Sequence, residues 1–254
     1  MGRLLAALSL ALAAALAASG ARATTTDPFA NWAAVVVSGD FHAAHTNHPT
    51  ETFDNARRDV SAELLRKGFL ASNLREFSVR PEVEADHPGK ADLERIYETL
   101  KTLAGQASGG CLVYFTSHGA PQGVVLDGQL LPPQLMDQMI SDACGRRPTI
   151  VIISACFSGV FVPALADTNR MIFTAARPDR SSFGCSESDK YPYFDACMLE
   201  ALPQAHDFVA LAPKVQACVR RRENEIGASP PSEPQVSIGP ELRFTLPLMA
   251  LAPG

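Results

Sequence analysis

The apolar positions of the chain follow two alternating patterns. Short apolar runs at 32–38, 111–116 and 150–153 are almost uninterrupted, which is typical of strands buried on both faces of a parallel sheet. Between such runs, apolar residues recur every three or four positions, as Ala56, Val60 and Leu64 do, which indicates helices. The alternation predicts an α/β fold with a mostly parallel sheet covered by helices on both faces.

The boundaries follow from glycine, proline and the periodicity. A hairpin is expected at 124–131, turning at Asp127-Gly128, and the last strand should lie near a sheet edge because it contains Pro247. Strands are predicted at 32–38, 74–79, 111–116, 150–153, 171–175 and 242–248. Helices are predicted at 53–67, 93–103, 133–144, 196–202 and 213–225.

The first 23 residues have the pattern of an export signal. Arg3 supplies a positive charge, residues 4–18 are almost wholly apolar, and Ala21-Arg22-Ala23 offers small residues for cleavage. We therefore expect a signal peptide at 1–23, a single domain at 24–254 and a periplasmic or secreted protein. No later stretch has the roughly 20 apolar residues that a spanning helix needs. The net charge of −5, without a basic cluster, argues against nucleic acid as a partner.

Two reactive side chains directly follow two of the predicted strands. His118 comes after the strand at 111–116, and Cys156 comes after the strand at 150–153. If these strands are neighbours, both residues lie at the carboxyl edge of the sheet, where open α/β sheets keep their sites. The pair predicts a cysteine peptidase dyad, with Cys156 as the nucleophile and His118 as the general acid. The N–H groups of Gly119 and Cys156 would form the oxyanion hole.

Other chemistries have weaker signals. Ser158 lacks the Gly-x-Ser-x-Gly surroundings of a serine hydrolase, so a turn role is favoured. His42, His45 and His48 are spaced by three residues, but no cysteine or carboxylate cluster accompanies them. We expect neither a metal nor a cofactor. Both Cys156 and His118 could instead have purely structural roles. Cys156 would then be a buried packing residue, and His118 would be a histidine whose hydrogen bonds are satisfied at a strand end.

Three segments together resemble a known family. Residues 117–119 (Ser-His-Gly), 154–159 (Ser-Ala-Cys-Phe-Ser-Gly) and 177–185 resemble clan CD cysteine peptidases, specifically bacterial members of the C13, or legumain, family. The resemblance runs from about Val35 to Leu202. It implies a caspase-like three-layer fold, a peptide or protein substrate, and hydrolysis after Asn or Asp. Because the family includes the catalytic subunit of the GPI transamidase, transpeptidation is an alternative. A non-catalytic binding protein on this fold is a second alternative.

The substrate pocket departs from that family pattern. Legumains have a glutamate two residues before the nucleophile, where this chain has Ser154. Their basic residue near the start of the first helix has no exact match, and Arg57 and Arg58 lie close to its position. The pocket therefore lacks the negative charge of that glutamate but keeps its hydrogen-bond donors. For this reason we expect that a P1 Asp is accepted at least as well as a P1 Asn. The candidate substrate-binding residues are Asn55, Arg57, Ser154, Arg180, Ser182 and Asp195.

Five cysteines remain besides Cys156. An oxidising compartment allows disulfides. Cys111 and Cys144 lie near the amino ends of the two reactive strands, so we predict a bridge between them. The odd number leaves at least one further thiol free, and Cys185 lies in the segment where C13 relatives line their pocket.

Overall fold

The computed structural model describes residues 27–253, in which strands and helices alternate as predicted. The strands are β1 (Trp32–Ser38), β2 (Leu74–Ser78), β3 (Gly89–Lys90), β4 (Gly110–Thr116), β5 (Gly119–Ala120), β6 (Gly123–Leu126), β7 (Gln129–Leu131), β8 (Thr149–Ser154), β9 (Arg170–Thr174) and β10 (Gln235–Ile238). The helices are α1 (Thr52–Arg66), α2 (Leu93–Gln106), α3 (Pro133–Cys144), α4 (Phe161–Leu165), α5 (Tyr193–Ala201), α6 (Phe208–Glu225) and α7 (Pro240–Thr245). The proposed signal peptide lies outside the described residues.

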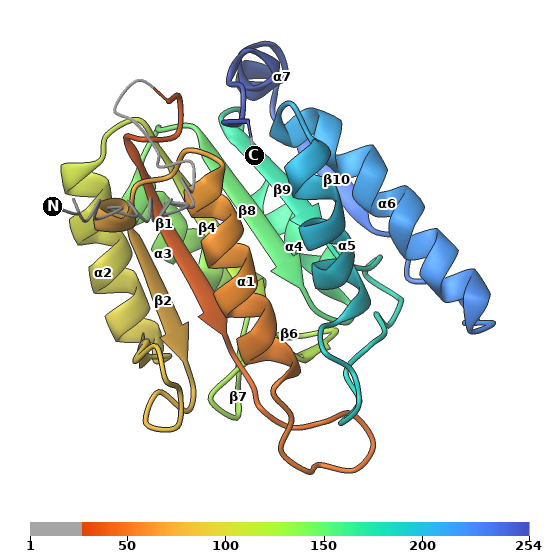
Figure 1. Ribbon diagram of the computed structural model, residues 1–254. Helices are drawn as coiled ribbons and strands as arrows, with labels where there is room; N and C mark the ends of the chain where they lie inside the picture. The colour runs from red at the N-terminus through yellow and green to blue at the C-terminus, as the bar shows by residue number, and fades with distance from the viewer. Residues whose placement is uncertain (1–26, 254) are drawn as a thin grey trace, which may run out of the picture.

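Seven strands form one sheet in the order β10-β9-β8-β4-β1-β2-β3 (Figure 1). All neighbouring strands are parallel except β10, which runs antiparallel to β9. Helices α1, α5 and α6 pack on one face, and α2, α3 and α4 pack on the other. The fold is therefore the predicted three-layer α/β sandwich.

The alternation of strand side chains explains the two hydrophobic cores. In β1, Ala34 and Val36 belong to the core under α1, whereas Val35 and Val37 belong to the core under α2. All seven residues of β1 are buried. Because neighbouring side chains point to opposite faces, a strand covered on both sides needs an unbroken apolar run, and this central strand has one.

Two predicted elements are corrected. The strand expected at 242–248 is wrong: the segment forms α7 and a short 3₁₀ helix, with Pro240 in the first helical turn. Leu242 and Leu246 are both buried in the same core, and their spacing of four fits a helix. The helix expected to open at Pro213 begins earlier, at Phe208, because the Asp207 side chain accepts a hydrogen bond from the Ala210 N–H at 2.7 Å and caps it.

Two disulfides tie helices into this framework. The predicted bridge between Cys111 and Cys144 is present and joins β4 to the end of α3. A second bridge, between Cys197 and Cys218, joins α5 to α6. The free cysteines in the described part of the chain are Cys156 and Cys185. No helix within residues 27–253 is long and apolar enough to cross a membrane.

Candidate active site

The ends of β4 and β8 bring the two reactive residues to the same edge of the sheet. The strands are parallel neighbours with Thr116 opposite Ser154, so His118 and Cys156 each lie two residues beyond a register pair. The Ser117 N–H extends this pairing by donating to the Ser154 carbonyl oxygen at 3.0 Å. The neighbouring-strand geometry predicted from the sequence is therefore correct.

Gly119 occupies a position where the two backbones touch. A Cβ atom at this residue would lie 2.2 Å from the carbonyl oxygen of Cys156 and 3.0 Å from the Cβ of Ala155. Any larger residue would push the histidine strand away from the cysteine strand. This close approach gives the glycine a definite structural role beside the reactive cysteine.

The orientation of His118 is set by its contacts on both sides. Its Nε2 lies 2.8 Å from the backbone carbonyl oxygen of His42, and its ring packs edge-on against Phe53 of α1 at a centroid distance of 5.0 Å. A carbonyl oxygen can only accept a hydrogen bond, so Nε2 must carry the hydrogen. Nδ1 is then the nitrogen that remains to exchange a proton with a substrate.

The loop after β9 covers the thiol of Cys156. The Ser182 N–H donates to Sγ at 3.2 Å, and Ser182 also places its carbonyl and hydroxyl oxygens 3.5 and 3.6 Å from the sulfur. Phe157 adopts a left-handed backbone (φ 58°), and its N–H donates to the Arg180 carbonyl oxygen at 2.8 Å. The loop therefore supports both the sulfur and the residue that follows it.

The same loop is joined to the segment between β1 and α1. The Ala44 N–H donates to the Cys185 carbonyl oxygen at 2.7 Å, and the Thr52 hydroxyl donates to the Asp189 carbonyl oxygen at 2.6 Å. Burial raises the pKa of the Cys185 thiol well above its usual value, and the negative charges of Cys156 and then Asp195 add to the rise. Cys185 is therefore a poor source of thiolate.

Asp195 lies beneath the site and not in a pocket wall. Its carboxylate, in the first turn of α5, is fully buried and accepts hydrogen bonds from the hydroxyls of Ser154, Thr116 and Tyr114. Burial raises the pKa of Asp195 to about 6, against the lowering effect of these hydrogen bonds. Ser154 is equally enclosed, so neither candidate presents its side chain to solvent.

Arg57 pairs with a cluster of carboxylates and makes no hydrogen bond or ion pair with His118 or Cys156. Its guanidinium has no exposed surface and pairs with four carboxylates at 2.6–3.4 Å. These carboxylates are Asp54, Glu76, Glu84 and Asp86. All the directions in which its nitrogens can donate point to these partners, so Arg57 is not free to bind a substrate carboxylate.

The remaining pocket candidates lie near the loop after β9. Arg180 pairs with Asp179 at 2.6 Å, about a quarter of its side chain is exposed, and its Nε has no partner among the described residues. Asn55 donates to the Lys190 carbonyl oxygen at 3.2 Å. Of the six candidates, Ser182 contacts Cys156 directly and Arg180 contacts the residue after it.

The three loop histidines have separate partners. His42 Nδ1 lies 2.7 Å from Asp40, and His48 Nδ1 lies 3.0 Å from Glu187. Within residues 27–253 no group of three or more His, Cys, Asp or Glu side chains has the arrangement of a metal site.

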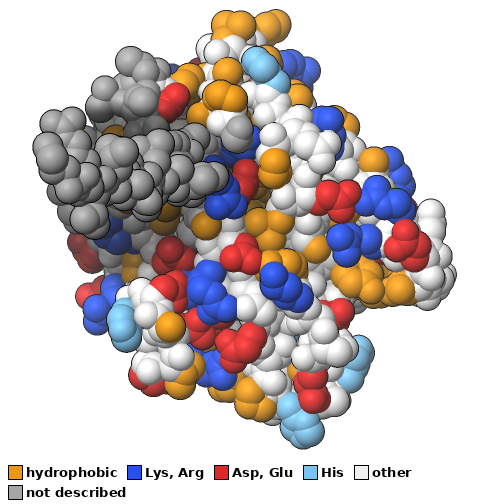
Figure 2. Space-filling model, viewed as in Figure 1, with side chains coloured by type: hydrophobic (Ala, Val, Ile, Leu, Met, Phe, Trp, Pro, Cys, Tyr) orange, Lys and Arg blue, Asp and Glu red, His pale blue; other side chains and the backbone are white. Residues whose placement is uncertain are grey.

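Over the face seen in Figure 2, acidic and basic side chains lie next to one another.

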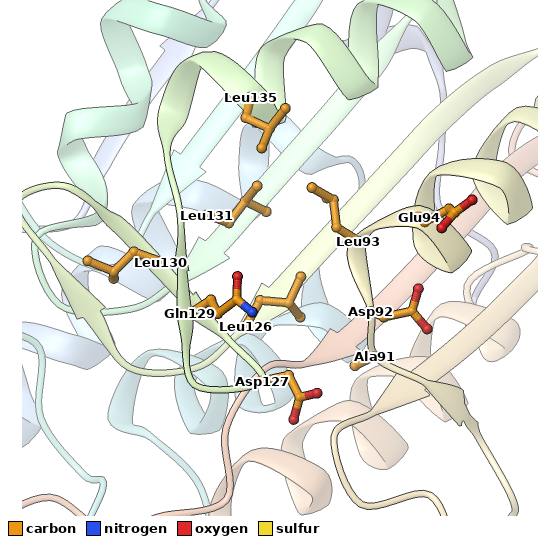
Figure 3. Close-up of a pocket in the computed structure, with 10 residues that line it drawn as sticks. All are labelled: Ala91, Asp92, Leu93, Glu94, Leu126, Asp127, Gln129, Leu130, Leu131 and Leu135. Atoms are coloured by element: carbon orange, nitrogen blue, oxygen red, sulfur yellow. The ribbon is translucent and has the colours of Figure 1, made fainter.

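A cavity of about 360 Å³ lies beside the hairpin that follows Gly119 (Figure 3). Leu126 and Leu131 of the hairpin face Leu93 of α2 and Leu135 of α3 across it. Its walls contain none of the candidate site residues. The chemistry therefore resides at the strand ends and not in this cavity.

Comparison with known proteins agrees with the site. Residues 89–212, which include both His118 and Cys156, match the sequence model of the Peptidase C13 family. The chain is a C13-type cysteine peptidase. A search of the curated proteins finds no match to this sequence. The family predicted from the sequence is thus confirmed.

The fold of this C13 peptidase is similar to a solved caspase. The crystal structure of caspase-1 from Spodoptera frugiperda superposes with a TM-score of 0.58, at 15% identity, over 84% of this chain and 88% of the caspase. At this identity the similarity establishes the fold alone, which is caspase-like as predicted.

Some contacts of the site have little or no signal in the sequence. The His42 carbonyl and the Ser182 N–H are backbone groups, which every residue offers, so no side-chain pattern indicates them. The link from Thr116 and Tyr114 to Asp195 does have a signal. Polar groups two residues apart on an apolar strand share one face, and they need a polar partner there.

Proposed function

We propose that this C13 peptidase is an endopeptidase that hydrolyses peptide bonds after Asp or Asn through Cys156 and His118. The observation that carries the proposal is the hydrogen bond from His118 Nε2 to the His42 carbonyl, at the strand end next to Cys156. It selects Nδ1 as the nitrogen for proton transfer. The Ser182 N–H, directed at Sγ, is a favourable partner for a thiolate.

The reaction follows from these assignments. The Cys156 thiolate attacks the scissile carbonyl carbon, and the carbonyl π electrons move to its oxygen. As that oxygen's electrons return, the C–N bond breaks and the His118 imidazolium gives its Nδ1 proton to the leaving amine. Neutral Nδ1 then takes a proton from the water that attacks the thioester. Collapse of this second intermediate releases the acid and restores the thiolate and the imidazolium.

The oxyanion would be stabilised by backbone donors. The Cys156 N–H donates no hydrogen bond to any residue among 27–253, so it is available to a substrate oxygen. Gly119 brings its own backbone against Cys156 without a Cβ in the way. Two N–H groups at the point where negative charge develops are the arrangement that acyl transfer requires.

The preference for Asp or Asn draws on donors in the loop after β9. Arg180 and Ser182 are the candidate donors in the contact shell of Cys156 and Phe157. A P1 carboxylate or amide oxygen needs such donors. With Arg57 bound to four carboxylates, Arg180 is the remaining cation among the six candidates.

The test is a peptide library with the P1 residue varied, applied to the wild type and to two variants. Cys156→Ala should lose hydrolysis. Ser158→Ala should keep it, because the Ser158 hydroxyl accepts from the Ala176 N–H and serves the turn. Hydrolysis that survives in Cys156→Ala and disappears in Ser158→Ala would reject the cysteine nucleophile.

Thiol labelling supplies a test that needs no substrate. Limiting iodoacetamide should alkylate Cys156 before Cys185, because burial raises the pKa of the Cys185 thiol. Peptide mapping by mass spectrometry gives the order. Labelling of Cys185 first, with activity retained, would contradict the assignment of Cys156.

We also infer that the enzyme works in an oxidising compartment, periplasmic or extracellular. The support is the pair of disulfides, Cys111 with Cys144 and Cys197 with Cys218, because structural disulfides persist in such compartments. Protein isolated from its native cells under acid quench should show four extra alkylatable thiols after reduction. Full labelling without a reductant would reject this inference.

A further inference from the structure

One carboxylate connects the two strands that carry the reactive residues. Asp195 Oδ2 accepts hydrogen bonds from the Ser154 hydroxyl of β8 at 2.5 Å and from the Thr116 hydroxyl of β4 at 3.2 Å. Its Oδ1 accepts from the Tyr114 hydroxyl of β4 at 2.6 Å. All four side chains lie in the interior.

The position of these hydroxyls relates them to the reactive residues. Thr116 and Ser154 are register partners, and His118 and Cys156 each follow two residues later. A carboxylate oxygen shared by both hydroxyls limits sliding and separation of the two strand ends. The geometry at this oxygen is therefore transmitted over two residues to the imidazole on one side and to the thiol on the other.

Asp195 has no cation among its hydrogen-bond partners. The titratable groups that face it are Tyr114 of β4 and Cys185 of the loop after β9, and the electrostatic effect of Asp195 raises the pKa of both. From the described part of β8 it accepts a hydrogen bond from the Ser154 hydroxyl. Burial without a counter-charge opposes ionisation of the Asp195 carboxyl. A negative charge on Asp195 at neutral pH therefore does not stabilise the fold, and it needs another explanation.

Attachment of α5 to the sheet does not depend on this carboxylate. Phe194 and Met198 of the same helix are buried in the hydrophobic core. The bridge from Cys197 to Cys218 fastens α5 to α6. The helix therefore has apolar and covalent attachments of its own.

We propose that Asp195 is a positioning residue that holds Cys156 and His118 in reactive geometry through the hydroxyls of Ser154 and Thr116. This inference rests on the proposed function of the two reactive residues. It assigns Asp195 no contact with substrate, because the carboxylate is enclosed. The effect should therefore appear in turnover and not in substrate binding.

The experiment compares Asp195→Asn, Ser154→Ala and the double variant with the wild type, using one peptide that the wild type cleaves. Asp195→Asn should lower kcat by roughly 10- to 100-fold and change KM by less than about twofold, since small displacements of reacting groups cost this much. Ser154→Ala should lower kcat in the same way. The double variant should be no slower than Asp195→Asn alone, because both changes break the same link.

The matched control is Glu63→Gln on α1. Glu63 is also a buried carboxylate, but its side chain pairs with Arg66 of its own helix. Its kcat should equal that of the wild type. Cys156→Ala is assayed in the same series to report on the proposed function separately.

The outcomes separate the two claims. If Cys156→Ala is inactive and Asp195→Asn keeps the wild-type kcat, the positioning role is rejected and the proposed function stands. If the Asp195 and Ser154 effects multiply, Asp195 does not act through Ser154 and the inference fails. If Cys156→Ala remains active, both claims fail. Should Asp195→Asn not fold, an unchanged kcat in Ser154→Ala still rejects the inference.

Discussion

Two regions of this enzyme bury carboxylates, and they do so in opposite ways. Around Arg57 the charges are opposed, because four carboxylates surround one guanidinium between α1 and β2. Around Asp195 one carboxylate is held by three neutral hydroxyls. Both sites are closed to solvent at their centres.

The difference separates a stabilising cluster from a functional one. In the Arg57 cluster, hydrogen bonds and charge from the carboxylates outweigh the desolvation that would otherwise lower the pKa of the guanidinium. Desolvation also raises the pKa of the Asp54, Glu76 and Glu84 carboxyls in that cluster, and it raises the pKa of Asp195 to about 6. What distinguishes Asp195 is that hydroxyls and no cation are its hydrogen-bond partners. A buried carboxyl without a cation, joined to both reactive strands, is a candidate for function.

The greatest loss should be in catalysis, at the strand ends beside Asp195. Cys156→Ala and His118→Ala should each lower kcat/KM by on the order of a thousandfold or more, because a nucleophile and its acid act as a unit. Thermal unfolding should change little, since both residues lie at the sheet edge. A steady-state assay with matched unfolding curves checks this, and near-normal activity in either variant would refute the dyad.

The next largest effect is on stability at the Arg57 side. Arg57→Ala should lower the free energy of unfolding by about 3–5 kcal/mol, because it leaves buried carboxylates without their partner. Turnover per folded molecule should stay close to that of the wild type. Urea unfolding, together with activity corrected for the folded fraction, measures both quantities.

Arg95→Ala on α2 is the control for a surface pair. Arg95 and its partner Asp92 are both exposed, and an exposed ion pair of this kind contributes about 0–1 kcal/mol. If Arg57→Ala were no more destabilising than Arg95→Ala, the Arg57 cluster would have no structural role. A selective loss of kcat in Arg57→Ala would instead bring Arg57 back into the site.

The framework of this comparison can be predicted from the sequence, because it depends on local patterns. Uninterrupted apolar runs predict β4 and β8, and helical spacing between them predicts the crossover α3. These elements are sufficient to bring His118 and Cys156 to one edge. The hairpin turn can also be predicted, because Asp-Gly is a typical sequence for a tight turn with positive φ. Asp127 and Gly128 have φ values of 51° and 76°.

The identity of the partners inside the two clusters cannot be predicted in this way, although Tyr114 and Thr116 indicate that some polar group must face them. Arg57 in the sequence is a cation near the start of a helix, and only tertiary packing surrounds it with Glu76, Glu84 and Asp86 from later segments. Asp195 similarly gives no indication of its depth. Single-residue chemistry predicts pocket donors and acceptors at these positions, whereas burial is a property of the assembled layers.

The third effect is a change of stability with pH. The folded-state pKa of Asp195, about 6, is above the usual 3.8, so between these values the folded protein binds a proton that the unfolded chain has lost. This contribution therefore stabilises the fold as pH falls from 7 to 4, and it is lost as pH rises through 6. The difference of about two units corresponds to roughly 3 kcal/mol.

Asp195→Asn isolates that contribution from all other titrating groups. The wild type should gain about 2 kcal/mol of unfolding free energy relative to the variant as pH falls from 7 to 4, and the rest of the roughly 3 kcal/mol below pH 4. Denaturant unfolding at a series of pH values provides the measurement. A difference between the two proteins that is constant with pH would mean that Asp195 is not the unpaired buried acid described above.

The smallest effect concerns Arg180, which is the candidate cation that remains for the substrate. Arg57 is bound to four carboxylates, whereas Arg180 pairs with Asp179 alone, and its backbone supports the residue after Cys156. A P1 Asp is charged near pH 7, and losing a cation partner costs a carboxylate more than it costs an amide. Arg180→Ala should therefore reduce kcat/KM about tenfold more for a P1 Asp peptide than for its P1 Asn counterpart, which is about 1.4 kcal/mol. Equal losses for both peptides would show that Arg180 supports the loop without meeting the P1 side chain, and a cation for P1 Asp would then have to come from outside the six candidates.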